Sequence, residues 1–90
     1  MIPIFVSELL TPNQPGEEST WRIVNIDKYP TANVKIYSPT GEIVYESWDY
    51  KNDWDGKGMN GKSLPTGPYM YMIDRGDETQ VEQGWLYIFN

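Results

Sequence analysis

The sequence contains neither cysteine nor histidine. This excludes disulfide bonds, thiolate chemistry and the catalytic groups that combine Ser, His and Asp or Cys and His. It also removes the usual ligands of transition metals. The absence of cysteine does not fix the compartment, because it fits a cytosolic protein and equally an exported protein that is stabilised without disulfides.

Basic residues are few, since seven Lys and Arg stand against thirteen Asp and Glu, for a net charge of −6. Nucleic acids and anionic lipids both select basic surfaces, so we expect neither as a partner. No apolar run approaches the length of a membrane span, and we expect no direct membrane insertion. The opening MIPIFV lacks the basic region and the length of a signal peptide, so an exported domain would depend on a larger parent chain for that signal.

Aromatic residues are abundant, with four Trp and seven Tyr among 90 residues. We expect one domain, residues 1–90, whose core is built on these large side chains. A chain of this length leaves little room for a deep catalytic cleft beside such a core, so we expect no enzyme. Asp53 and Asp55 form an acid pair of the kind used in glycoside hydrolysis, but chance explains one such pair among thirteen acidic residues.

The periodicity of apolar residues indicates strands rather than helices. No segment keeps the helical period over about 11 residues, whereas short alternating runs are separated by Gly, Pro and Asn. The pattern predicts an all-β, Ig-like antiparallel β-sandwich of about seven short strands. The turn SPTGE, which contains Gly41, predicts a hairpin between two of them. The clearest strand candidates are residues 2–6, 21–26, 33–37, 43–47, 68–74 and 84–89.

The stretch DWDG and the Asn60 that follows it suggest either a calcium loop or a turn. Asp53, Asp55 and Asn60 supply oxygen atoms, which are the ligands that Ca²⁺ prefers. An EF-hand is excluded, because Lys57 and Leu64 occupy positions where that motif needs oxygen ligands. Asp, Asn and Gly also favour tight turns by themselves, and we favour the turn.

Four aromatic residues alternate along two candidate strands. Exposed, they would stack on sugar rings; buried, they would form the core face of the sandwich, which is the interpretation we favour. Trp48 and Trp54 lie outside clear strands and are the better candidates for exposure. The four alternating residues are Tyr69, Tyr71, Trp85 and Tyr87.

Arg75, Gly76 and Asp77 spell the integrin-binding tripeptide RGD. A glycine flanked by charged residues is also typical of a β-turn between two strands. We therefore interpret the tripeptide as a turn rather than as an adhesion motif.

Four segments in order carry a resemblance to a known family. They are LTPN at residues 10–13, TWRIVNIDKYPTANVKIYSPTGEIVYES at 20–47, YKNDWDGKGMNGKSLPTGPYMYMI at 50–73 and GWLYIFN at 84–90. Their order resembles the type B C-terminal sorting domain of the Bacteroidetes type IX secretion system, also called the gliding motility-associated C-terminal domain. The matching motif residues are Trp21, Tyr29, Pro30, Gly41, Trp54, Asp55, Gly56, Asn60, Gly61, Pro65, Gly67, Tyr69, Tyr71, Gly84 and Trp85.

The chain departs from the family pattern in an early loop. Residues 13–20, NQPGEEST, replace an acidic, glycine-rich loop, and only Glu17 and Glu18 remain there as candidate cation ligands. The resemblance implies that residues 52–73 form a structural connection, in which Trp54 packs on the sandwich and the Asp55-Gly56 and Asn60-Gly61 pairs make turns.

The resemblance implies a sorting function. The domain would be the C-terminal module of a larger exported protein, with the type IX translocon and a covalently linked upstream cargo as partners. It would pass through the periplasm and then be secreted or held at the outer-membrane surface. No cofactor is implied, apart from the open question of Ca²⁺. The alternative function is that of an accessory Ig-like module that binds carbohydrate or calcium on a surface protein.

Overall fold

The computed structural model describes residues 2–76 and 81–90. Within them there are strands and two short 3₁₀ helices but no α-helix, which confirms the all-β prediction. Within the same residues no helix is long and apolar enough to cross a membrane. The elements are β1 (Phe5–Val6), β2 (Leu9–Leu10), η1 (Glu17–Ser19), β3 (Ile23–Val24), η2 (Ile26–Lys28), β4 (Asn33–Tyr37), β5 (Ile43–Trp48), β6 (Gly67–Asp74) and β7 (Glu82–Ile88).

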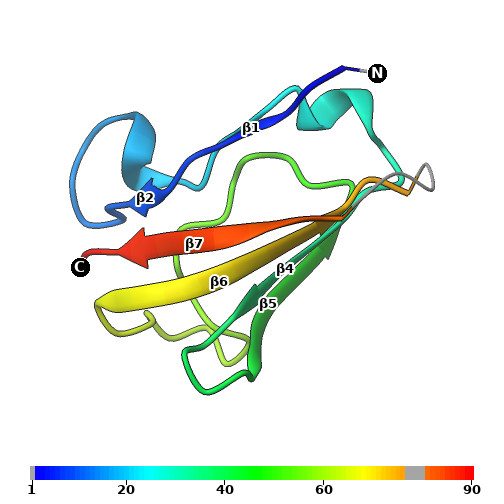
Figure 1. The fold of residues 1–90 in the computed structure, drawn as a ribbon. Coiled ribbons are helices and arrows are strands. Elements are labelled where there is room, and N and C mark those ends of the chain that lie inside the picture. Colours follow the sequence, from blue (N-terminus) through cyan, green and yellow to red (C-terminus); the bar gives the residue numbers. More distant parts are fainter. Residues whose placement is uncertain (1, 77–80) are drawn as a thin grey trace.

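The strands form two sheets that face each other across one core, as predicted for a sandwich (Figure 1). The larger sheet has the order β2-β7-β6-β4-β5, and the smaller one pairs β1 with β3. The expectation of a wholly antiparallel sandwich is wrong at one place, because β2 runs parallel to β7. Only two residues separate β1 from β2, so the chain has no room to reverse between the two sheets. The direction of β1 therefore fixes the direction of β2.

The hairpin between β4 and β5 is confirmed. Its turn closes through the Ser38 amide, which donates to the Glu42 carbonyl at 2.8 Å. Gly41 has a φ of +92°, a conformation that L-residues with a side chain rarely adopt. The register shifts between Ile36 and Tyr37, which places a bulge in the β5 edge opposite them.

Two predicted strands are shorter than expected. Only Phe5–Val6 and Ile23–Val24 pair within the predicted ranges 2–6 and 21–26. Asn25 ends the second strand because its backbone is left-handed, with φ of +71°, and η2 begins directly after it. The Asn25 side-chain amide then donates to the Pro3 carbonyl at 2.9 Å, which ties the start of the chain to this corner.

The core face of β6 follows the prediction, but that of β7 does not. Tyr69 is buried, and Tyr71 packs against the core beside it. Trp85 and Tyr87, expected in the core, are 58% and 45% exposed. The register pairs Tyr69 with Leu86, and cross-strand partners share a face, so β7 turns Leu86 inward and its aromatic residues outward. The buried core is Ile4, Leu10, Trp21, Ile23, Ile26, Ala32, Val34, Ile36, Tyr50, Trp54, Tyr69, Ile73, Leu86 and Ile88.

Candidate functional site

The connection from β5 to β6, residues 49–66, is held to the sandwich by the hydroxyl of Tyr50. This buried hydroxyl accepts a hydrogen bond from the Trp54 amide at 2.9 Å and donates to the Trp21 carbonyl at 2.7 Å. The Trp21 amide in turn donates to the Trp54 carbonyl at 2.8 Å. Burial raises the pKa of the Tyr50 hydroxyl well above its usual value, so it stays protonated and able to donate.

Asn52 makes a second link between the connection and the small sheet. Its backbone is left-handed, with φ of +60°, and its side-chain oxygen accepts a hydrogen bond from the Ile23 amide at 2.7 Å. Tyr50 and Asn52 belong to the YKNDWDG motif, but the sequence assigned no role to either. Their position within the motif before Trp54 was the available signal, but only the fold shows that they cross-link two layers.

Trp21 lies at the centre of an aromatic cluster. Its ring centroid is 5.4 Å from Tyr50, 6.2 Å from Trp54 and 5.9 Å from Tyr71. The Trp54 ring also stacks on Tyr45 at 4.7 Å. Trp54 is 4% exposed, so its candidacy for exposure is wrong and its predicted packing on the sandwich is confirmed. Edge-on and stacked contacts of this kind stabilise aromatic clusters beyond the area that they bury.

Asn60 and Gly61 lie in a turn, as predicted, which the Gly61 amide closes by donating to the Gly58 carbonyl at 2.9 Å, whereas Gly56 lies at a bend. Gly56 and Gly61 have φ of +85° and +79°. The Asn60 side-chain oxygen accepts from the Lys62 amide at 3.0 Å, which is a short-range turn contact. The Pro65 carbonyl accepts from the Tyr69 hydroxyl at 2.7 Å just before Gly67 opens β6.

Among the described residues, the candidate carboxylate ligands of calcium do not gather into one site. Asp55 forms an ion pair with Lys57 at 3.1 Å, and Asn60 is engaged in its turn. Glu17 and Glu18 lie in η1, away from the 53–60 stretch in the sequence and in a different element. Across residues 2–76 and 81–90, no three His, Cys, Asp or Glu side chains gather into a group that could hold a metal ion.

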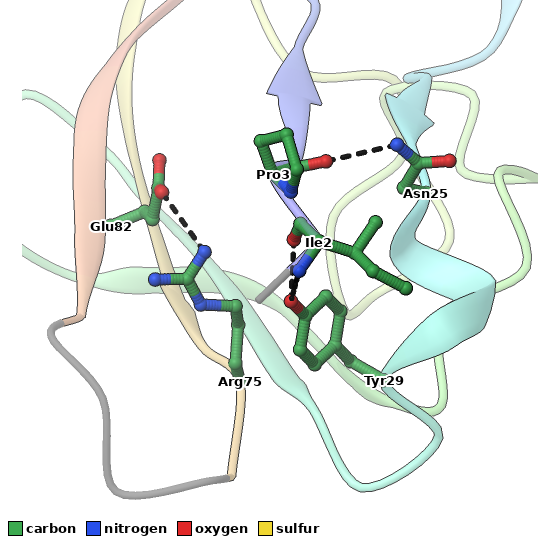
Figure 2. A network of polar contacts seen from close by, with 6 residues as sticks. All are labelled: Ile2, Pro3, Asn25, Tyr29, Arg75 and Glu82. Carbon is green, nitrogen blue, oxygen red and sulfur yellow. Dashed lines mark hydrogen bonds and ion pairs between the residues drawn. The ribbon is translucent and has the colours of Figure 1, made fainter.

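A polar network closes the end of the sandwich near the start of the chain (Figure 2). The Tyr29 hydroxyl accepts from the Ile2 amide and donates to the Ile2 carbonyl, while Pro30 follows it in a turn closed from Ala32 to Tyr29 at 2.9 Å. Arg75 lies against the same ring, 5.7 Å from its centroid, and pairs with Glu82 at 3.3 Å.

The RGD tripeptide belongs in part to this network. Arg75 is only 6% exposed, so its guanidinium group stabilises the fold and is not presented to a receptor. Asp77 lies outside the described residues. The burial of Arg75 supports the interpretation of the tripeptide as part of the fold rather than as an adhesion motif.

The outer face of the large sheet carries aromatic and apolar side chains in two adjacent rows. The register places Tyr37 beside Ile43 on one side and Met70 on the other, and Met70 beside Trp85. Tyr87 lies in the next row. Trp48, 68% exposed, occupies the far corner of this face, as predicted. An exposed apolar surface of this kind is typical of an interaction site.

Two neighbouring hollows open at the β4–β5 turn. One, about 330 Å³ in volume, lies between Pro39 in the turn and the segment 64–69. The other, about 280 Å³, lies between the start of β5 and residues 58–60. Val44 and Leu64 line both hollows, so the two adjoin, and we call the pair the apolar groove.

Comparison with known proteins gives the family. A sequence profile described as the CHU_C type IX secretion signal domain matches residues 4–88, nearly the whole chain. The chain belongs to this family. Type IX secretion signals imply export across the outer membrane, to the cell surface or into the medium, so this domain has a sorting role related to that system. No curated protein sequence matches the chain significantly.

A solved structure shares the fold. PorZ, described as an essential bacterial surface component of the type IX secretion system of Porphyromonas gingivalis, superimposes with a TM-score of 0.70. The two are 18% identical, and the match covers 97% of this chain and 11% of PorZ. At that identity the likeness shows the fold alone.

Proposed function

We propose that this domain is a sorting signal that the type IX secretion machinery recognises in order to move a covalently linked cargo protein across the outer membrane. The domain folds in the periplasm and acts as a recognition module rather than as an enzyme. After export, the cargo is released or held at the cell surface. The partners are components of the type IX translocon and the cargo itself.

The family match over residues 4–88 carries this proposal. The internal roles of the motif residues support it, because Trp21, Trp54, Tyr71 and Gly56 stabilise the sandwich and do not converge on a catalytic group. Such a motif stabilises the fold, and the translocon then recognises the surface of the folded domain. The apolar rows on the outer sheet face and the groove at the β4–β5 turn are exposed surfaces that the translocon could contact.

A transplant tests the proposal. The 90-residue chain is fused to the C-terminus of a fluorescent protein that carries a signal peptide, and the fusion is expressed in a gliding bacterium with and without a working type IX system. We expect export only from the strain with the working system. Retention of a folded fusion in the periplasm of both strains would contradict the proposal.

Two variants control for folding in that assay. Trp54→Ala removes a ring that is 4% exposed and should abolish export by unfolding the domain. Trp85→Ala removes a ring that is 58% exposed and should leave the fold intact. A loss of export in Trp85→Ala with unchanged thermal unfolding would place a recognised surface on the outer sheet face.

We propose further that the domain needs no metal ion. Asp55 forms an ion pair with Lys57, and the Asn60 side-chain oxygen accepts a hydrogen bond in its turn. A calcium ion would have to displace these contacts in order to bind. Thermal unfolding with millimolar Ca²⁺ and with EDTA should then give the same midpoint. A midpoint that rises with Ca²⁺ would restore the calcium site.

The exposure of Trp85 and Tyr87 favours one second candidate, a carbohydrate-binding accessory module. Their rings lie on one face of β7 and alternate along it, as stacking on sugar rings would require. Titration calorimetry with soluble glucans, mannans and chitin oligosaccharides tests this function. Heat that disappears in Trp85→Ala would support it, and no heat with any of them would exclude these sugars.

A further inference from the structure

β5 is an open edge of the large sheet (Figure 1). It pairs with β4 on one side, and in the described part of the chain no strand pairs with its other side. An unpaired edge presents backbone N–H and C=O groups to any extended chain that approaches. Proteins usually protect such edges with Lys, Pro or a β-bulge. Residues 43–48 contain neither Lys nor Pro, and the bulge of β5 lies at Val44, beyond Glu46 and Trp48.

The hydrogen-bond pattern identifies which backbone groups point outward. The Asp49 amide donates to the Ala32 carbonyl at 3.0 Å, so the pair of these two residues is a hydrogen-bonded one. Because hydrogen-bonded and non-hydrogen-bonded pairs alternate in an antiparallel ladder, Ser47 bonds toward β4, whereas Glu46 and Trp48 direct their N–H and C=O groups to the open side. The Trp48 carbonyl also accepts from the Ser47 hydroxyl at 3.3 Å.

The apolar groove continues this edge toward the start of β5. The hollow of about 280 Å³ is lined by Ile43 and Val44 of β5 together with Met59 and Leu64. A strand that ran antiparallel to β5 past Trp48 and Glu46 would enter the groove with its next residues. Added strands typically gain affinity from main-chain hydrogen bonds and specificity from such pockets.

The charge along the edge selects the kind of strand. Glu42 and Glu46 are both exposed, and β5 contains no Lys or Arg. The Glu46 carboxylate accepts one hydrogen bond from the Asn33 side-chain amide at 3.1 Å, and Lys35 lies opposite Glu46 on β4. If a second copy of this chain paired with the edge, two acidic edges would lie against each other, and each molecule carries a net charge of −6. This repulsion disfavours self-pairing.

We propose that the β5 edge and its groove receive an extended segment of another protein, with a basic residue opposite Glu46 and an apolar residue in the groove. The segment adds as a sixth strand to the large sheet, antiparallel to β5. This inference rests on the geometry of the edge and holds whether or not the domain sorts cargo.

The first test uses a blocked peptide, Ser-Leu-Thr-Lys-Thr-Leu-Thr, whose Lys falls opposite Glu46 when the strand is antiparallel. NMR hydrogen exchange on the intact chain follows individual amides. At ten times the dissociation constant of the peptide, exchange at Glu46 and Trp48 should slow about tenfold. Ser47, already bonded to β4, should change little. No protection with millimolar peptide would overturn the proposal.

Two peptide controls leave the protein unchanged, so its folding is not in question. Replacing the peptide Lys by Glu should weaken binding about fivefold or more, because like charges would then lie opposite each other. Methylating the amide of that Lys removes a main-chain donor and should abolish the protection. Equal binding by all three peptides would overturn the added-strand geometry and the charge preference.

A protein variant gives the reciprocal result. Glu46→Lys should invert the preference, so that the peptide with Glu binds better than the peptide with Lys. Sedimentation of the chain without peptide checks for self-association. Protection of Glu46 and Trp48 that rises with protein concentration would show that a second copy occupies the edge, which would also overturn the proposal.

Discussion

The ring of Tyr71 lies directly over Gly84, its cross-strand partner on the core face of the large sheet. A β-carbon at Gly84 would lie 2.6 Å from the Tyr71 hydroxyl oxygen and 2.8 Å from its Cζ atom. The aromatic ring therefore occupies the space that a side chain on β7 would need. This contact explains why the motif joins a glycine on β7 to an aromatic residue on β6.

Gly84→Ala should destabilise the domain. Replacing glycine inside a strand ordinarily stabilises a protein, but here the added methyl group must displace the ring, at a cost of about 1–3 kcal/mol. Urea denaturation measures the free energy of unfolding. The same substitution in a Tyr71→Val background should cost much less, because the clash is removed. An equal cost in both backgrounds would show that the ring is not the cause.

Tyr50→Phe should weaken the attachment of the 49–66 connection. The substitution keeps the ring in the aromatic cluster but leaves the Trp54 amide and the Trp21 carbonyl without their shared partner. Unpaired buried groups cost about 1–3 kcal/mol. Chemical denaturation tests the loss, with Tyr87→Phe as the control, since Tyr87 is 45% exposed. Equal stability of the two variants would contradict this role of the hydroxyl.

Trp54→Ala should behave as a core deletion and lower the free energy of unfolding by about 3–5 kcal/mol. Trp48→Ala removes the same side chain from a position that is 68% exposed and should cost about 0.5 kcal/mol or less. Both variants lose one indole, so their comparison isolates burial. A loss for Trp54→Ala as small as that for Trp48→Ala would contradict its place in the core.

The stability of the domain should fall in alkaline solution. Burial raises the pKa of Tyr50 above its usual value, so the folded state keeps this proton while the unfolded state loses it above about pH 10. The unfolded state then binds fewer protons, and the free energy of unfolding falls with rising pH, by up to about 1.4 kcal/mol per pH unit for one such group. Below about pH 10 this contribution is fully present.

Urea denaturation across the range from about pH 9 to 11 measures this decline. Burial also raises the pKa of Tyr45, Tyr69 and Tyr71, so several groups add to the slope. Tyr50→Phe should make the slope shallower by up to about 1.4 kcal/mol per pH unit, the contribution of one proton, because it removes one of these groups. An unchanged slope in that variant would show that Tyr50 does not titrate differently in the two states.

The sequence alone determined that the domain consists of strands and where most of them lie along the chain. Alternation in residues 33–37 and 68–74 predicted β4 and β6, and SPTGE predicted the hairpin, because period-two patterns and turn residues act over a few positions. The resemblance carried by the ordered motifs identified the family. Local patterns of this kind need no knowledge of distant partners.

Only the tertiary structure decided which face of β7 is buried. Alternation separates Trp85 and Tyr87 from Leu86 and Ile88, but either pair could fill a core, and the larger residues suggested the wrong one. The pairing of Tyr69 with Leu86 settles the matter, and Trp21 and Trp54, which come from other segments, supply the aromatic bulk instead. Burial depends on register and on residues far apart in the chain, so a single strand's pattern cannot specify it.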